Sequence, residues 1–228
     1  MPSVSEPATV SEAAAVFADA SRDGRRVSIG REGGDLVVST ARLDRVLEHA
    51  AGDLTATVEA GIRLSALDRH LATAGQMLAL DPPGDPTVGA CIAANLSGPR
   101  RHRYGTARDL VLGVTLVLAD GTTASSGGKV VKNVAGYDLG KLLCGSGGTL
   151  GLIARVSLRL HPRPRAGGTL VRELDGSPEQ AWRLVRALQH STLVPSAVDL
   201  LWPDRLAVLL EGGERAVEAQ LALGREVL

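Results

Sequence analysis

Three glycine-rich segments in the middle of the chain are the residues best suited to hold a ligand. They span 82–99, 127–141 and 145–153 of the 228-residue sequence. Because glycine lacks a Cβ, such segments let backbone N–H groups approach a phosphate or a flat ring closely. One segment alone is typical of a tight turn. Three within 72 positions favour an extended, nucleotide-like ligand.

The rare polar side chains of the chain fall in the same region. All lysines, asparagines, tyrosines and cysteines lie between positions 91 and 144. They are Lys129, Lys132, Lys141, Asn95, Asn133, Tyr104, Tyr137, Cys91 and Cys144. We interpret this clustering as functional, with chance as the alternative.

A basic cluster follows the first glycine-rich segment. It comprises Arg100, Arg101, His102, Arg103 and Arg108. Arginine binds carboxylates and phosphates through a planar fork of donors. The cluster could therefore face a phosphate, an anionic substrate or a partner subunit, and a solvated loop is an equal alternative.

Several other chemistries are excluded by missing residues. Leu150 occupies the third glycine position of a dinucleotide-binding fingerprint, and Lys129 lacks the neighbours of a Walker loop. The histidines show no metal-ligand spacing with cysteine, and no serine lies in a G-x-S-x-G elbow. We expect Cys91 to be a small buried residue rather than a nucleophile.

The composition is that of an ordinary globular protein, with 44% hydrophobic and 22% charged residues. The net charge of zero argues against a general nucleic-acid binder. No apolar run reaches the ~18 residues of a membrane span, and the N-terminus lacks the features of a signal peptide. Two cysteines make no disulfide framework. We predict a cytoplasmic protein.

Apolar periodicity and turn residues predict a mixed α/β chain. The first expected elements are a helix over 5–21, strands over 25–29 and 36–39, a helix over 40–49, a strand over 53–60 and a helix over 63–73. Next come a helix over 87–96, strands over 112–119 and 122–125 joined by a turn at 120–121, an extended segment over 128–132, a helix over 138–143 and a strand over 149–160.

The clearest domain boundary is the segment HPRPRAGG at 161–168, where prolines restrict the backbone and the following glycines make it flexible. Beyond it the pattern predicts a strand over 169–174, a helix over 178–190, strands over 197–201 and 206–210, and a helix over 213–226. This βαββα order is a split βαβ unit of ferredoxin-like type that lacks one strand.

Longer motifs run through roughly 35–165. They are ST at 39–40, EHAAGDLTATVEAG at 48–61, AGQMLALDPP at 74–83, TVGACIAANLSGPRRHRYGTARDLVLGV at 87–114, GGKVVKNVAGYDLGKLLCGSGGTLGLI at 127–153 and LHPRPR at 160–165. With these motifs the sequence resembles the FAD-binding subunit of bacterial glycolate oxidase. That subunit belongs to the flavoproteins that share the FAD-binding domain of vanillyl-alcohol oxidase and p-cresol methylhydroxylase (PCMH).

The resemblance implies an α+β fold: a two-subdomain PCMH-type FAD-binding domain followed by a partial ferredoxin-like α/β cap. The FAD-binding domain would span 1–165, with subdomains of about 1–78 and 79–165, and a truncated cap or substrate domain would span 166–228. The implied enzyme is an FAD-dependent oxidoreductase that oxidises glycolate to glyoxylate. It would work with a second flavoprotein subunit and an iron–sulfur subunit, and those partners could hold it at the inner face of the membrane.

The resemblance also implies which residues bind FAD. The stretch 87–98 would follow the flavin and pyrophosphate, and 145–153 would contact the ADP half. The expected cofactor-binding residues are Pro83, Thr87, Val88, Gly89, Ala90, Asn95, Gly98, Arg108, Gly145, Gly148, Thr149, Leu150, Gly151 and Ile153. A second group would support the FAD lobe or meet the partner: Lys129, Lys132, Asn133, Tyr137 and Asp138. No metal ligand and no catalytic base is assigned.

The chain departs from the family pattern in its first loop and at position 90. The loop is only GREGGD at 30–35, without the longer GGGTK-like run, and Ala90 replaces the second glycine after Thr87-Val88. No histidine lies in the loop, so we expect non-covalent FAD. Two alternatives stay open: a non-catalytic assembly subunit with weak or lost FAD binding, and an oxidase of another 2-hydroxy acid such as lactate.

Overall fold

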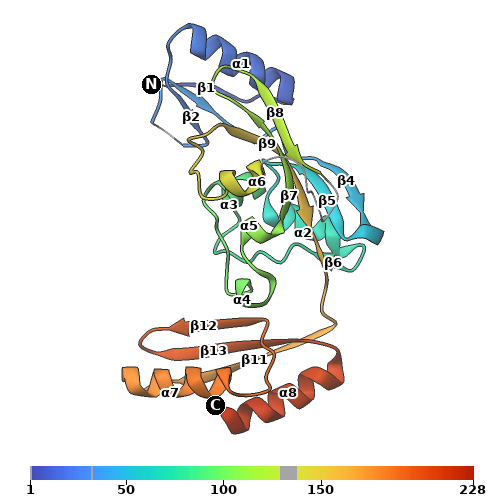
Figure 1. The fold of residues 1–228 in the computed structure, drawn as a ribbon, viewed down its shortest axis with the longest axis vertical. Coiled ribbons are helices and arrows are strands. Elements are labelled where there is room, and N and C mark those ends of the chain that lie inside the picture. The colour runs from blue at the N-terminus through green and yellow to red at the C-terminus, as the bar shows by residue number, and fades with distance from the viewer. Residues whose placement is uncertain (1, 32, 129–137) are drawn as a thin grey trace. The chain divides into compact units, whose positions relative to one another are not determined.

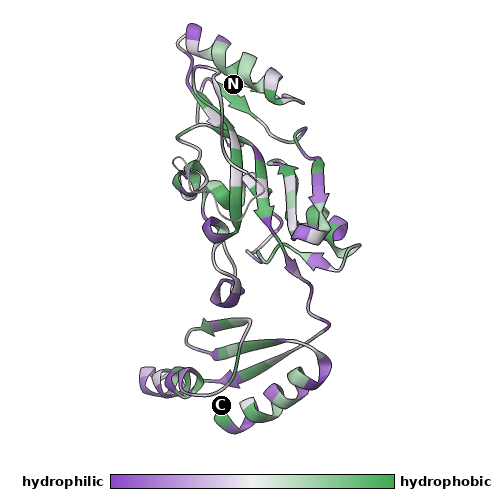
Figure 2. Cartoon of the chain, turned by 45° about the vertical axis from the view of Figure 1, so that its right-hand side comes forward, coloured by the Kyte–Doolittle hydropathy of each residue, from purple (hydrophilic) through white to green (hydrophobic). Residues whose placement is uncertain are grey.

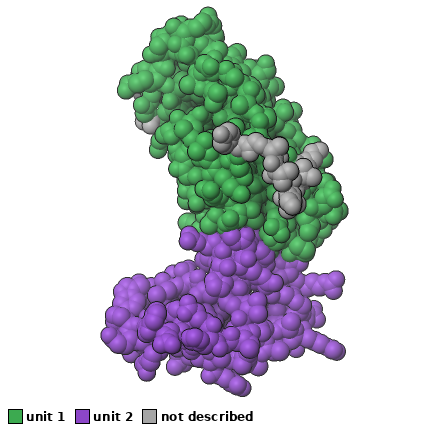
Figure 3. Space-filling model, viewed as in Figure 1, with its two compact units in different colours: residues 1–78, 82–97, 106–162 green, residues 79–81, 98–105, 163–228 purple. Residues whose placement is uncertain are grey.

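The computed structural model describes residues 2–31, 33–128 and 138–228, and these form two compact units. Unit 1 comprises 1–78, 82–97 and 106–162, and unit 2 comprises 79–81, 98–105 and 163–228 (Figure 3). Unit 2 therefore takes two short segments from the middle of the chain in addition to the C-terminal part.

Unit 1 is built around a five-stranded antiparallel sheet (Figure 1). Its strands, in spatial order, are β4 (Val46–Ala50), β5 (Thr55–Glu59), β9 (Leu152–Arg159), β7 (Val111–Val117) and β8 (Thr123–Gly127). Buried side chains alternate along β9 from Ala154 onward, since one face of an antiparallel sheet packs on the core, whereas its first residues, Leu152 and Ile153, are both buried. The turn between β7 and β8 contains Asp120, whose carboxylate accepts a hydrogen bond from the Thr122 N–H.

A small parallel sheet and the first helix pack at the N-terminal end of unit 1. The sheet has the order β1 (Ser3–Ser5), β3 (Leu36–Val38) and β2 (Val27–Ile29). Helix α1 (Val10–Arg22) begins where the Thr9 hydroxyl accepts a hydrogen bond from the Glu12 N–H. It buries Phe17 against Val38 and Leu152, so this core joins the small sheet to the end of the large one.

Short elements of unit 1 connect the strands. They are η1 (Ala51–Asp53), α2 (Leu64–Ala72), β6 (Gln76–Met77), α3 (Val88–Ala93), α5 (Ala107–Leu110), α6 (Leu139–Leu143) and β10 (His161–Pro162). Residues Arg63 and Thr87 form an isolated β-bridge, so the starts of α2 and α3 lie side by side.

Unit 2 is a three-stranded antiparallel sheet with the order β11 (Ala166–Glu173), β13 (Arg205–Gly212) and β12 (Ala197–Leu201). Both outer strands run antiparallel to β13, which confirms the predicted split βαβ arrangement. Helices α7 (Pro178–Gln189) and α8 (Glu214–Val227) share an apolar core with the sheet. Figure 2 shows hydrophilic and hydrophobic residues alternating along α8. Helix α4 (Arg101–Tyr104) also belongs to this unit.

The predicted helix over 40–49 is wrong. Residues 40–45 are turns and irregular chain, and β4 follows as an edge strand paired with β5. The apolar residues at 43, 46 and 47 fit a helical period, but pairing with β5 overrides that local preference. The other predicted elements within the described residues are present. The extended segment expected over 128–132 falls mostly outside them. No helix among the described residues is long and apolar enough to cross a bilayer.

Candidate functional site

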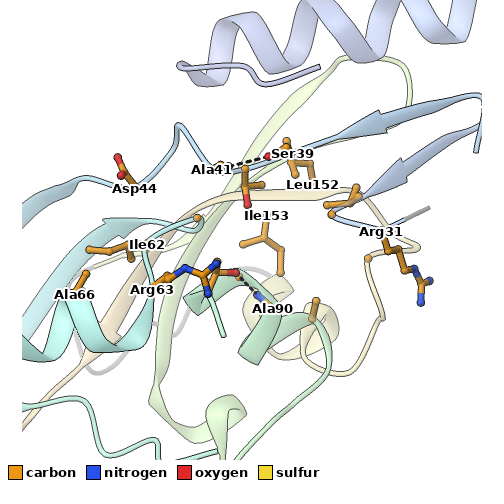
Figure 4. A pocket seen from close by; sticks show the side chains of 18 of the residues that line it. Arg31, Ser39, Ala41, Asp44, Ile62, Arg63, Ala66, Ala90, Leu152 and Ile153 are labelled. Atoms are coloured by element: carbon orange, nitrogen blue, oxygen red, sulfur yellow. Dashed lines mark hydrogen bonds between the residues drawn. The ribbon is translucent and has the colours of Figure 1, made fainter. Parts of the chain in front are cut away.

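A cavity of unit 1 has a volume of about 690 Å³. Its lining comes from four stretches of sequence: 29–44, 61–69, 87–93 and 147–153. In the view of Figure 4, Ser39, Ile153 and Ala90 follow one another across the pocket. A cavity of this size lies within the range that cofactor and drug-sized ligands occupy.

Two glycines present bare backbone to this cavity. Gly30 and Gly147 have φ angles of +65° and +62°, and a Cβ built on either meets no protein atom within 4 Å. Glycine adopts this left-handed conformation without the steric cost that other residues incur. The space that a side chain would fill is therefore left to whatever the pocket binds.

Two other lining glycines allow the walls to pack together. A Cβ on Gly61 would lie 1.9 Å from the Thr40 carbonyl oxygen, and one on Gly89 would lie 3.0 Å from Ala60. The Gly89 N–H donates to the Ala60 carbonyl at 2.7 Å, which holds the first turn of α3 against the end of β5. These glycines serve the close approach of one wall to another.

The charged lining of the pocket is predominantly positive. Arg31, Arg63 and Arg69 line it together with a single carboxylate, Asp44. The Arg63 guanidinium donates to the Asp85 carbonyl at 2.7 Å, which orients it beside the start of α2. Backbone N–H groups and guanidinium groups suit an anionic ligand such as a pyrophosphate.

The Asp85 carboxylate fixes the first turn of α2. Its oxygens accept hydrogen bonds from the Ser65 N–H at 2.9 Å and from the Ser65 hydroxyl at 2.8 Å. These bonds hold the pKa of Asp85 below its ordinary value. Because Ser65, Ala66 and Arg69 line the pocket, this contact positions one of its walls.

A second cavity of about 340 Å³ shares Ile29, Gly148 and Gly151 with the first. Phe17 and Val27 give it an apolar side. The shared residues make the two cavities neighbours. This arrangement suits a ligand with a charged centre and a flat apolar end.

The structure brings together eight of the residues predicted to bind the cofactor. Six line the larger cavity: Thr87, Gly89, Ala90, Gly148, Gly151 and Ile153. Gly148, Thr149, Leu150 and Gly151 line the smaller one. The Thr87 hydroxyl accepts a hydrogen bond from the Ala90 N–H at 3.2 Å, so its oxygen caps α3.

Six of the predicted residues line neither of these two cavities. They are Pro83, Val88, Asn95, Gly98, Arg108 and Gly145. Val88 is fully buried. Gly98 belongs to unit 2, where a Cβ would lie 2.0 Å from the Asp81 carbonyl oxygen. The Asn95 side chain accepts from the Arg108 N–H, which links these two residues to each other.

The predicted support group falls mainly outside the described residues. This applies to Lys129, Lys132, Asn133 and Tyr137. Asp138 is described: its carboxylate accepts from the Lys141 N–H at 3.1 Å and pairs with the Lys141 ammonium at 3.2 Å. Both contacts are local to the start of α6.

Sequence reasoning missed most of the first two walls. The missed lining residues include Gly30, Arg31, Ser39, Thr40, Asp44, Gly61, Ile62, Arg63, Ser65 and Arg69. One signal was available, because the glycine-rich loop at 30–35 and the ST pair at 39–40 both flank the strand at 36–38. For 61–69 the sequence offers only an amphipathic helix, whose polar face does not reveal its neighbour.

Comparisons with known proteins identify the family of this chain. A family described as "FAD binding domain" matches residues 3–127. The glycolate oxidase subunit GlcE of Escherichia coli is 37% identical over 80% of this chain and 53% of its own length. A mitochondrial D-lactate dehydrogenase (cytochrome) of Saccharomyces cerevisiae is 34% identical over 70% of this chain and 27% of its own. This chain thus spans about half of the first relative and less of the second.

A solved structure described as alkyldihydroxyacetonephosphate synthase has a similar fold. Its TM-score is 0.80 at 17% sequence identity, over 98% of this chain and 49% of that one. At this identity the likeness concerns the fold, and it confirms the α+β class with a PCMH-type FAD domain.

Proposed function

Because this chain belongs to the family of FAD-binding domains, we propose that the large pocket of unit 1 holds its FAD cofactor without a covalent link. The observation that carries the assignment is the bare backbone at Gly30 and Gly147. These two glycines are far apart in the sequence, yet both line one cavity whose charged side chains are mainly positive. The pocket fits the group, since a flavin dinucleotide has an anionic centre and two flat ends.

Each wall has a role in this arrangement. The backbone at Gly30 and the guanidinium groups of Arg31 and Arg63 bind the pyrophosphate. The stretch 87–90 and Ile153 lie along the flavin half. Gly147, Gly148 and Gly151 hold the ADP half, and the smaller cavity, which shares Gly148 and Gly151 with the larger one, takes its flat end.

The activity we propose is oxidation of a 2-hydroxy acid, with glycolate going to glyoxylate. The names of the relatives support this class, since they include a glycolate oxidase subunit and a D-lactate dehydrogenase. Bound FAD would accept the hydride, and with it two electrons, from the C–H bond of such a substrate. The protein would act as one subunit of a complex, with a second flavoprotein subunit and an iron–sulfur subunit that receives the electrons. The protein would be cytoplasmic, and these partner subunits would hold it at the inner face of the membrane.

The first experiment is the absorbance spectrum of the purified chain, followed by acid release and identification of any flavin. We expect an oxidised-flavin band near ~450 nm and close to one FAD per chain, or the same spectrum after addition of FAD. A colourless chain that takes up no added FAD overturns the assignment and favours the assembly-subunit alternative.

Oxidation of lactate is a second candidate, favoured by the D-lactate dehydrogenase among the relatives. The two substrates differ by one methyl group, which a binding pocket distinguishes by only about 10–200-fold. Reduction of an artificial electron acceptor by the flavin-loaded complex, with glycolate and each lactate enantiomer compared, decides between them. Turnover of D-lactate well above glycolate would contradict the glycolate assignment.

A further inference from the structure

A buried carboxylate lies between two walls of the pocket without lining it. Glu59 ends β5, and its side chain has no exposed surface. The Arg45 guanidinium donates to both carboxylate oxygens, from Nη2 to Oε1 at 2.8 Å and from Nε to Oε2 at 3.0 Å. The Arg45 N–H donates to Oε2 as well, at 3.0 Å. Three donors from one residue therefore converge on this carboxylate.

The pair stands where two pocket walls join the sheet. Residues Ser39, Thr40, Ala41 and Asp44 line the cavity just before Arg45, and Gly61, Ile62 and Arg63 line it just after Glu59. Backbone bonds tie the same two stretches together: the Glu59 N–H donates to the Arg45 carbonyl at 2.9 Å, and the Gly61 N–H donates to the Leu43 carbonyl at 2.8 Å.

The stretch 39–45 contains turns and irregular chain, so it depends on these ties for its position. Leu43 is the one fully buried side chain within it, and the Leu43 N–H donates to the Thr40 carbonyl at 2.9 Å. The two-pronged Arg–carboxylate geometry fixes direction as well as distance. A lysine in place of Arg45 would keep the charge but lose the fork.

The two partners of this ion pair differ in their exposure to solvent. Its carboxylate is enclosed, whereas the Arg45 side chain is 60% exposed. Arg155 on the neighbouring strand β9 is the register partner of Glu59, and Asp44 precedes Arg45 in the sequence. The hydrogen bonds from Arg45 hold the pKa of Glu59 below its ordinary value. Loss of the Arg45 side chain leaves a buried carboxylate short of two of its three donors, which is costly.

We propose that Arg45 and Glu59 are positioning residues for the cofactor site, which fix the wall 39–44 against the wall 61–63 and thereby set the affinity for FAD. Neither residue touches the cavity, so the effect passes through the segments on either side of the pair. The inference rests on the proposed function, because it assigns a binding role to the same pocket.

The test compares FAD dissociation constants of four purified chains by titration of flavin fluorescence: wild type, Arg45→Ala, Arg45→Lys and Arg42→Ala. Arg42 is the matched control, since it is an exposed arginine of the same segment that contacts the Glu6 carbonyl and is not among the residues that line this cavity. Arg45→Ala should weaken FAD binding about ten- to hundredfold. Arg45→Lys should recover part of the loss, and Arg42→Ala should bind as wild type.

Two further measurements test whether the variants are folded and whether the charge of Glu59 matters for FAD binding. The thermal midpoint of each apo chain shows whether the variant is folded. We expect the FAD affinity of wild type to decline as the pH falls through the lowered pKa of Glu59, and Glu59→Gln should lack this decline. If wild type binds FAD and Arg45→Ala binds equally well, the positioning role is wrong while the FAD assignment stands. If wild type binds no flavin, both are wrong.

Discussion

Gly147 and Gly75 have the same backbone conformation, but only Gly147 lines the pocket. Their φ angles are +62° and +66°, and a Cβ on either meets nothing within 4 Å. A change to alanine therefore imposes the same strain, about 1 kcal/mol, at both positions. We expect Gly147→Ala to weaken FAD binding roughly tenfold because its methyl group enters the cavity, while Gly75→Ala leaves the affinity unchanged. Flavin fluorescence titration measures both, and equal affinities would remove Gly147 from the site.

The two thiols provide a test of burial at single residues. Burial raises the pKa of Cys91 and of Cys144 to about 11 each. At pH 8 only about one thiol in a thousand is then the reactive thiolate. We expect both to react with a colorimetric disulfide reagent far more slowly in the native chain than in urea. Cys144 should react before Cys91, since Cys91 is fully buried and Cys144 half-buried. Rapid native labelling of Cys91 would contradict this packing.

The glycines predicted to bind the cofactor lie in two different surroundings. Gly89 and Gly148 were predicted as cofactor ligands and line the cavity. Gly98 was predicted on the same grounds, yet its missing Cβ makes room for the backbone of Asp81. A glycine pattern reports close approach, but it does not say whether a ligand or another strand approaches. Only the fold supplies that information.

At the scale of elements, the regular helices and long strands followed from periodicity, and the edge strand β4 did not. Its sequence VLEHA is polar at Glu48 and His49, because only one side of an edge strand is paired and charged residues protect the other. A register shift between Val46 and Glu48 also breaks the alternation of the strand. Both features remove the period-two signal that identifies a strand, so a helical reading fits the same residues better.

Helix α2 allows a test of how one element positions another. The Asp85 carboxylate caps its first turn from a separate segment. Since the pKa of Asp85 is lowered in the folded chain, its stabilising effect is present above the ordinary aspartate pKa and is lost as the pH falls through the folded value. Asp85→Asn should lower the thermal midpoint at pH 7 and flatten the loss of stability between about pH 5 and 3.

The control for this prediction is Asp53→Asn, a change of the same kind at an exposed position in η1. Thermal unfolding followed by circular dichroism at several pH values gives both curves. An Asp85→Asn chain with the acid dependence of wild type would show that the cap on α2 contributes nothing to stability.

At the scale of the whole molecule, the sequence predicted a boundary at 161–168, and it did not predict which segments make up unit 2. Segments 79–81 and 98–105 join unit 2 although they lie within the predicted FAD-binding region. The contacts that recruit them are non-local: the Arg100 N–H donates to the Asp81 carboxylate, and the Arg100 guanidinium pairs with Glu211 at 2.6 Å. Local patterns carry no information on partners more than a hundred positions apart.

The ion pair between Arg100 and Glu211 should stabilise unit 2. The Glu211 side chain is 7% exposed and that of Arg100 is 28% exposed, so the pair is largely shielded from water. Arg103 adds a contact from its guanidinium to the Glu211 carbonyl at 3.4 Å. Removal of one partner from such a pair costs more than an exposed pair is worth, because the other charge stays buried. Glu211→Ala should therefore destabilise unit 2 by about 3 kcal/mol, the lower end of the range for buried pairs, since part of Arg100 reaches solvent.

Both tryptophans, Trp182 and Trp202, belong to unit 2, but they are 62% and 52% exposed, so their emission changes little on unfolding. Backbone hydrogen exchange, measured segment by segment at increasing urea, reports on unit 2 directly. Glu218→Ala on the exposed face of α8 is the matched control. A midpoint shift in Glu211→Ala that exceeds the control, with an unchanged dependence on urea, would establish that segment 98–105 is held by a buried ion pair. Equal shifts in the two variants would mean that the sheet and its two helices hold unit 2 together without that segment.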